Sequence, residues 1–232
     1  MRNIIFRFRS CTFCTVPLPN GVADGRRIRF PPAAILCYNL RRGRTMNQIV
    51  KQRNIKPIEK KFLAPALDFV EEVFTDAVSP AEGKIVRALV QEIRAKKYYL
   101  PSLELLMVDD SERILGYANF SRYNIEGKFE DELLLLSPVA VRTEFQRQHI
   151  SKDLIEHGFA RAAEMGFKAV LVEGNPQNYT SRGFVPYHKF AITPGPGMHL
   201  PHPDCLMIKE LELGAAEKMR GSVDWSFYDA LS

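Results

Sequence analysis

The sequence predicts an α/β (α+β) fold in which helices cover a mixed sheet. Residues 133–141 form an almost unbroken apolar run of strand length, which is typical of a strand buried on both faces. Residues 142–148 form a short polar connection, and from His149 the apolar residues recur at helical spacing. A predicted β-hairpin, residues 103–123, precedes this unit. A hairpin followed by a strand–helix–strand crossover indicates a sheet with both antiparallel and parallel strands.

The elements expected before this central unit are a strand, two helices and the hairpin. Ser79 is placed to cap the second helix, because Pro80 occupies its first position and Glu82 supplies an early acidic residue. The expected ranges are 47–56 for the strand, 59–75 for the first helix, 103–108 and 114–123 for the hairpin strands, and 109–113 for their turn.

The elements expected after the central unit are shorter. Four prolines and two glycines between residues 192 and 204 predict an irregular loop there. The other expected ranges are 168–173 for a buried strand, 177–182 for a short helix, 184–190 for another strand and 205–211 for the last strand.

The connection between the central strand and helix is suited to an anion. A helix start presents unpaired backbone N–H groups and the positive end of a dipole, and its most frequent ligand is a phosphate. Arg142, Arg147 and Lys152 lie in or beside this connection and are expected to steer an anionic ligand towards it.

The charge distribution separates an N-terminal arm from the rest of the chain. The chain has 32 basic and 27 acidic residues, a net charge of +5. Residues 1–45 hold nine arginines, no lysine and one acidic residue, so the remaining residues carry a net charge of −3. We therefore expect no nucleic-acid partner for the body of the protein. No apolar run reaches the roughly 18 residues that a membrane-spanning helix requires, so we expect no membrane partner.

Three interpretations of the arm compete. Cys11-x-x-Cys14 resembles half of a zinc site, although no second pair follows at metal-ligand spacing. An arginine-rich, acid-poor segment is also typical of an organelle transit peptide. We favour a third interpretation, in which the chain truly starts at Met46, because lysine appears only after that residue. We expect a poorly ordered arm at residues 1–45 and a single domain at residues 46–232.

Cysteine and histidine usage indicates a cytoplasmic protein without a metal. Beyond the arm only Cys205 remains, and one cysteine cannot form a disulfide framework. His199-x-x-His202 lies in a proline-rich segment without a third ligand, which favours solvent-exposed histidines over a metal site.

The order of elements and three motifs resemble the GNAT superfamily of acetyl-CoA-dependent N-acetyltransferases, and within it the YhbS-like bacterial group. The motifs are the strand end Val139-Ala140-Val141, the loop Gln146-x-x-x-x-Ser151 and the segment Tyr179-x-x-x-Gly183-Phe184. The resemblance covers residues 49–213. It implies a mixed, mostly antiparallel sheet that is splayed between its fourth and fifth strands and has helices on both faces.

The resemblance also implies an activity, the transfer of an acetyl group from acetyl-CoA to a primary amine by direct attack in a ternary complex. A backbone N–H near Ala140 would polarise the thioester oxygen, and Tyr179 would protonate the departing thiolate. No metal is implied. The residues that the resemblance assigns to the cosubstrate are Val139, Ala140, Val141, Gln146, Arg147, Gln148, His149, Ile150 and Ser151.

Three positions depart from the family pattern, and the departure at Ser151, where the family has glycine or alanine, is mild. His149 stands where the family has a glycine, and its side chain either narrows the site or adds a donor to the phosphate. Leu135 stands where many members carry a glutamate base. The nearby carboxylates are Asp131, Glu132 and Glu173. We take Glu132 as the candidate general base, with a water chain as an alternative.

No motif identifies the acetyl acceptor, so a small-molecule amine and a peptide amine both remain open. The oligomeric state, monomer or homodimer, is open as well. The competing hypothesis for the function is a non-catalytic CoA-binding or interaction module with the same fold, whose pyrophosphate loop is degraded at His149.

Overall fold

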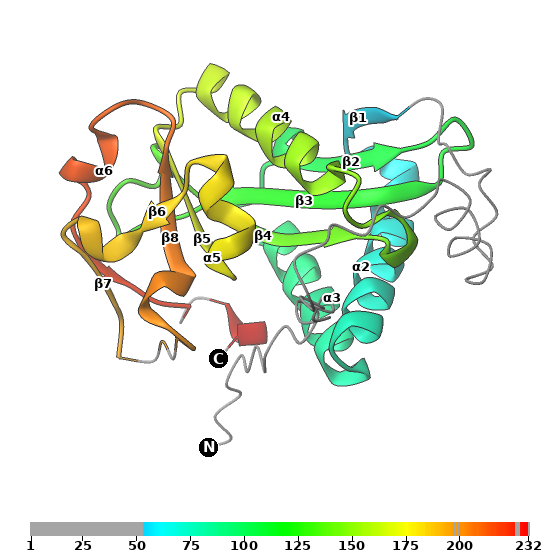
Figure 1. Ribbon diagram of the computed structural model, residues 1–232, viewed down its shortest axis with the longest axis horizontal. Helices are drawn as coiled ribbons and strands as arrows, with labels where there is room; N and C mark the ends of the chain where they lie inside the picture. The colour runs from blue at the N-terminus through cyan, green and yellow to red at the C-terminus, as the bar shows by residue number, and fades with distance from the viewer. Residues whose placement is uncertain (1–52, 197, 199, 226–227, 232) are drawn as a thin grey trace, which may run out of the picture. The chain divides into compact units, whose positions relative to one another are not determined.

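The structure is a computed structural model that describes residues 53–196, 198, 200–225 and 228–231 (Figure 1). Its main sheet has seven strands in the order β1-β2-β3-β4-β5-β8-β6. Every neighbouring pair is antiparallel except β4 and β5, which are parallel, so the predicted mixed sheet is confirmed. The strands are β1 (Asn54–Pro57), β2 (Glu104–Val108), β3 (Ile114–Arg122), β4 (Leu133–Val141), β5 (Ala169–Glu173), β6 (Val185–Pro186) and β8 (Leu206–Glu210).

Helices lie on both faces of this sheet, as predicted. On one face, α4 (Ile150–Glu164) packs with Gly158 against the ring of Phe120 in β3. A Cβ at residue 158 would come within 2.2 Å of that ring, so glycine lets the helix approach the strand. On the other face, α2 and α3 pack against the sheet (Figure 1). The remaining bounds are α2 (Leu63–Ala77), α3 (Pro80–Ala95), α5 (Pro176–Tyr179) and α6 (Ala215–Lys218).

Several predicted boundaries are confirmed. The strand predicted at residues 133–141 is β4, with the same bounds. Ser79 caps α3, because its hydroxyl accepts a hydrogen bond from the N–H of Glu82 at 3.2 Å. The helix before it begins at Leu63, later than predicted, because a 3₁₀ turn precedes it.

Two predictions about the C-terminal third were wrong. The strand predicted at residues 184–190 shrinks to β6, because Pro186 has no N–H to continue the ladder with β8. The strand predicted at residues 205–211 is not the last one. It is followed by β9 (Gly221–Val223), which pairs in parallel with β7 (Ile192–Pro194) inside the predicted irregular loop.

β4 and β5 pair only at their beginnings. Residues 133–135 are in register with residues 169–171, and beyond them the two strands share no ladder. The register between β3 and β4 also shifts between Ala118 and Phe120, so β4 carries a bulge opposite Asn119. The second half of β4 is therefore open on the side away from β3, which confirms the predicted splay between the fourth and fifth strands.

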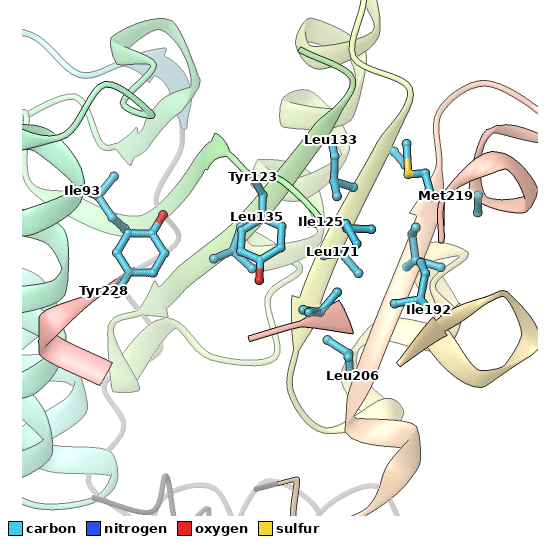
Figure 2. Packing of buried hydrophobic residues seen from close by; sticks show 14 of the residues in the cluster. Ile93, Tyr123, Ile125, Leu133, Leu135, Leu171, Ile192, Leu206, Met219 and Tyr228 are labelled. Carbon is cyan, nitrogen blue, oxygen red and sulfur yellow. The ribbon is translucent and has the colours of Figure 1, made fainter. Parts of the chain in front are cut away.

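One core cluster joins α3, the middle of the sheet and the C-terminal segment. Figure 2 shows Ile93 of α3 beside Tyr228 at one end of this cluster. The hydroxyl of Tyr228 pairs with that of Ser121 in β3 at 3.2 Å. Glu92 of α3 accepts hydrogen bonds from the two main-chain N–H groups that follow Tyr228, at 2.8 and 2.9 Å. The C-terminal segment is thus held on the α3 face of the sheet.

A buried charged cluster fastens α3 to β2. The Glu104 carboxylate, with an exposed fraction of 0%, accepts hydrogen bonds from Arg94 Nε at 3.1 Å, Tyr99 at 2.5 Å and Tyr117 at 2.7 Å. Burial and the neighbouring carboxylate raise the pKa of Tyr99 and of Tyr117, so both phenols stay protonated as donors. Both oxygens of this carboxylate are fully engaged within the cluster.

Some sequence predictions concern residues outside the described part of the chain. These are the predictions about residues 1–45, the pair Cys11 and Cys14, the start at Met46, and His199. Among the described residues, no helix combines the length and the apolar character needed to cross a membrane.

Candidate active site

Three elements meet at the carboxyl ends of β4 and β5. Because these strands are parallel, both end at the same edge of the sheet. β4 ends at Val141 and leads through residues 142–149 into α4, whereas β5 ends at Glu173 and leads into α5. The chain therefore brings the first turn of α4, the open half of β4 and α5 to one edge (Figure 1).

The open half of β4 presents main-chain groups to this edge. The N–H of Arg142 donates to the carbonyl of Leu115 in β3 at 3.1 Å. Hydrogen-bonded positions alternate along an antiparallel pair, so the next position of β4 bonded to β3 is Ala140, two residues earlier. The N–H and C=O of Val139 and of Val141 point the other way, where β4 has no ladder with β5. Of the N–H groups around Ala140, those of Val139 and Val141 are therefore open, whereas that of Ala140 itself faces β3.

The loop before α4 has a glycine-like backbone. Arg147 and His149 have φ angles of 61° and 64°, in the left-handed region that favours glycine. The first internal bond of α4 runs from the N–H of Asp153 to the carbonyl of His149 at 2.9 Å. The N–H groups of residues 150–152 thus lack an acceptor within the helix, and no side chain caps them, while the Ile150 side chain is buried. This arrangement suits a phosphate.

Two arginines from distant segments hold the loop in place. Arg53 donates to the main-chain oxygen of Gln148 at 2.8 Å and also contacts its side-chain oxygen. Arg182 donates to Ser151 Oγ at 3.0 Å. Gln146, at the start of the loop, is exposed. Both guanidinium groups add positive charge beside the start of α4, which favours an anion there.

Two of the three basic residues expected to steer an anion are engaged elsewhere. Arg142 bonds to Glu72 of α2 at 3.0 Å, and Lys152 pairs with Glu156 at 3.8 Å. Arg147 is exposed in the loop and has no ion-pair partner within the described residues. Arg147 is therefore the member of this group whose charge is available to a ligand.

Tyr179 lies over the carboxyl end of β5. Its ring rests on Gly174, where a Cβ would come within 2.5 Å of the ring, and makes a T-shaped contact with Phe184 at 5.6 Å between centroids. The Arg182 guanidinium lies 6.0 Å from the ring centroid. The Tyr179 hydroxyl has no hydrogen-bond partner in the described part of the chain. Burial raises the pKa of Tyr179 and Arg182 opposes the rise, so the phenol stays a proton donor at neutral pH.

Glu173, the last residue of β5, is the carboxylate nearest this edge. It is half-buried, and its Oε2 accepts a hydrogen bond from Nε1 of Trp225 at 2.8 Å. Trp225 also packs edge-on against Tyr123, with centroids 5.7 Å apart. Burial raises the pKa of Glu173, while the Trp225 bond stabilises the charged form and opposes the rise. A carboxylate with a raised pKa at a site edge is suited to accept a proton near neutral pH.

Glu132, the base expected from the sequence, lies at the opposite end of β4. It precedes Leu133, the first residue of the strand, and pairs with Lys168 at 3.0 Å. Asp131 is beside it, pairs with Arg122 at 3.7 Å and is largely exposed. At a rise of roughly 3.3 Å per residue, the length of β4 separates both carboxylates from Val139 and Val141. Glu132 thus lies far along β4 from the open half of the strand, whereas Glu173 lies at the end of β5.

Three residues at the site were missed from the sequence alone. Arg53 and Trp225 reach it from opposite ends of the described chain, and no motif links either residue to the loop or to β5. Arg182 lies within the Tyr179-x-x-x-Gly183 motif, so its position was a signal that could have been used. Among the described residues, no three His, Cys, Asp or Glu side chains gather as a metal would require.

Comparison with known proteins finds similar N-acetyltransferases. The uncharacterized N-acetyltransferase YhbS of Escherichia coli (strain K12) is 29% identical over 106 residues, which cover 46% of this chain and 59% of that protein. The uncharacterized N-acetyltransferase YjhQ of the same strain is 29% identical over 119 residues, covering 50% and 63%. This chain therefore spans about three fifths of the length of these relatives.

Solved structures share the fold. The crystal structure of YhbS from Escherichia coli in complex with CoA has a TM-score of 0.63 and 20% identity, covering 74% of this chain and 88% of that one. A GNAT family acetyltransferase from Brucella melitensis in complex with acetyl-CoA has a TM-score of 0.58 and 23% identity, covering 78% and 99%. The acetyltransferase (GNAT) family model matches residues 70–188, just over half of the sequence. The chain thus belongs to the acetyltransferase (GNAT) family.

Proposed function

We propose that this protein transfers an acetyl group from acetyl-CoA to a primary amine by direct attack in a ternary complex. The observation that carries the proposal is the parting of β4 from β5 beside the free N–H groups of α4. Family membership and two structural relatives described with CoA or acetyl-CoA support the same choice of cosubstrate. When bound, acetyl-CoA would supply an acetyl thioester, which an uncharged amine can attack without a covalent enzyme intermediate.

The residues fit this cosubstrate at two places. The N–H groups of residues 150–152, with Arg182 and Arg53 beside them, would hold its diphosphate. The open N–H and C=O groups of Val139 and Val141 would pair with the amides of its pantetheine arm. An N–H from the same strand segment would stabilise the charge that develops on the thioester oxygen.

Two side chains would move the protons. Glu173 accepts a proton from the ammonium form of the acceptor, and burial, which raises its pKa, makes it a stronger base for this transfer than an exposed glutamate. Tyr179, whose hydroxyl has no other partner among the described residues, donates a proton to the departing thiolate. Trp225 holds one oxygen of Glu173 and leaves the other for the amine.

Replacing Tyr179 with phenylalanine should lower kcat about a hundredfold and change the affinity for acetyl-CoA far less. This is the lower end of the usual effect of a general acid, because a thiolate leaves readily even without protonation. Steady-state release of CoA, with calorimetric binding of CoA alongside, measures both quantities. Tyr187→Phe, which removes a phenol from the 3₁₀ turn after β6, is the control and should behave as the wild type. Unchanged turnover in Tyr179→Phe would remove this residue from the mechanism.

The second candidate function is a non-catalytic CoA-binding or interaction module, and the side chain at His149 is the observation that favours it. However, the backbone at residue 149 already has the left-handed conformation that glycine would adopt, so the N–H groups after it are positioned despite the side chain. We therefore favour the enzyme.

The substitution His149→Gly separates these candidates. It should stabilise the fold by about 0.5–1 kcal/mol. Glycine removes the free-energy cost of a left-handed backbone at a residue with a Cβ, and this gain exceeds the conformational entropy that glycine loses on folding. Affinity for CoA should change by less than about threefold, a difference below 1 kcal/mol. Thermal unfolding and calorimetry measure the two effects. A large gain in affinity would instead support a loop degraded by the histidine.

The proposal as a whole is tested by incubating the purified protein with acetyl-CoA and a panel of primary amines. Thiol release that depends on the amine, together with the acetylated product in mass spectrometry, is the expected result. Binding of acetyl-CoA without acetylation of any amine would leave the binding module as the better account.

A further inference from the structure

Asn119 in β3 is a buried amide without a partner. Its exposed fraction is 0%, and neither Nδ2 nor Oδ1 has a hydrogen-bond partner within the described residues. Leaving buried donors and acceptors unpaired is unfavourable, so such groups in proteins usually meet a ligand or water. Asn119 is therefore a candidate contact for something that binds to the protein.

Two polar side chains that the strand pattern places beside Asn119 are engaged by other groups. Glu104 lies directly opposite it in β2, but its carboxylate is engaged by Arg94 and by two tyrosines. Ser121, two residues along the same face of β3, pairs with Tyr228 at 3.2 Å. None of these groups satisfies Asn119, although each is close enough in the strand pattern to share its face.

The position of Asn119 connects it with the proposed reaction. It lies opposite the bulge of β4, at the point where β4 leaves β5. Leu171 in β5 and Tyr228 belong to the same core cluster, and Tyr228 pairs with Ser121 in β3, so Leu171 and Ser121 face the same side of the sheet. Because side chains two residues apart in a strand share a face, Glu173 and Asn119 project from that side as well. β4 runs between the two strands and has already parted from β5 at this level, so their backbones are separated by at least two strand spacings, about 10 Å. Both side chains extend from the same face.

We propose that Asn119 binds the acetyl acceptor, and that this acceptor carries an amide close to its amine, as the N-terminal residue of a peptide does. The inference rests on the proposed acetyl transfer. A carboxamide offers one acceptor and an N–H donor side by side, which is the complement of a –CO–NH– group. With the amine at Glu173, the first peptide group of the acceptor is the amide that comes nearest to Asn119.

The test compares two amines with the wild type and with Asn119→Leu. The amines are a dipeptide amide with a free N-terminus and an alkylamine of similar size without an amide. The wild type should show a kcat/KM about tenfold to a hundredfold higher for the dipeptide amide, as expected for two hydrogen bonds. Asn119→Leu should lose this preference through a higher KM, with kcat and the alkylamine reaction nearly unchanged. Its melting temperature should rise, because an unpaired buried amide has been removed.

Ser121→Ala is the matched control, since its hydroxyl lies on the same face but is already paired. It should keep the preference for the dipeptide amide. If Asn119→Leu also keeps that preference, the inference is wrong and Asn119 is only an unpaired core residue. If Asn119→Leu instead weakens CoA binding and spares the amine preference, the amide contacts the cosubstrate, which also overturns the inference. If the wild-type protein acetylates both amines but the dipeptide amide no faster than the alkylamine, this inference is wrong and the proposed acetyl transfer still holds. Acetylation of neither amine would count against both.

Discussion

Replacing Glu173 with glutamine should lower kcat/KM for the amine about 10²–10⁴-fold at neutral pH, the usual contribution of a general base. An alkyl amine with a pKa near 10.4 is almost entirely protonated at pH 7, and removing that proton costs roughly 4–5 kcal/mol. In the proposed mechanism Glu173, at the carboxyl end of β5, accepts this proton. Glutamine keeps the size of the side chain and its contact with Trp225, but it cannot take the proton.

The same substitution should change the pH profile. Below the pKa of Glu173 the carboxyl is protonated and cannot act, so wild-type activity rises with pH through that pKa and then levels. Burial places this rise above the ordinary glutamate value of 4.5. In Glu173→Gln the rate should instead follow the fraction of free amine and keep rising towards pH 10. Trp225→Phe removes the bond that favours the charged carboxylate, so its rise should move to higher pH.

Glu132→Gln is the matched control for this prediction. Its carboxylate lies at the start of β4 and pairs with Lys168, so its removal should leave kcat/KM close to the wild-type value. The opposite result, an unchanged kcat/KM in Glu173→Gln and a lost activity in Glu132→Gln, would identify Glu132 as the base despite its position at the start of β4.

Glu104→Ala should lower the free energy of unfolding by about 3–5 kcal/mol, the usual effect of breaking a buried ion pair by removing one partner. The substitution leaves the Arg94 guanidinium without its counter-charge and takes the acceptor from Tyr99 and Tyr117. This penalty is large because all three groups lie between α3 and the sheet, where water replaces the lost bonds poorly.

Urea unfolding of the full chain measures this effect as a shift in midpoint at constant slope. Glu130→Ala, which breaks the surface pair with Lys97, is the control and should shift the midpoint far less. If both substitutions shifted it equally, the buried cluster would contribute no more than a surface ion pair.

The sequence was sufficient where local pattern and tertiary packing agree. β4 has the predicted bounds because an apolar run of that length suits a strand in a sheet covered on both faces. The cap of α3 was readable because Ser79 and Glu82 form their hydrogen bond locally. The splay between β4 and β5 came from the resemblance, since no local pattern states where two parallel strands stop pairing.

The sequence was insufficient where contacts between distant segments of the chain determine which residues lie together. Glu132, the candidate base from the sequence, precedes the first residue of β4, whereas Val139 and Val141 lie at the other end of that strand. Trp225 and Arg53 reach the site only because the C-terminal segment and the start of the fold pack there. Residues 184–190 have strand-like composition, yet the proline at 186 stops the ladder after two residues. Such outcomes depend on which elements become neighbours.

Hydrogen exchange of the main-chain amides, with and without CoA, tests the central claim most directly. The account predicts that CoA slows exchange at Val139, Val141 and residues 150–152, the N–H groups left open by β4 and by the start of α4. Amides at the start of β4, already paired with β5, should not change. Unchanged exchange at all of these open amides in the presence of saturating CoA would contradict the account.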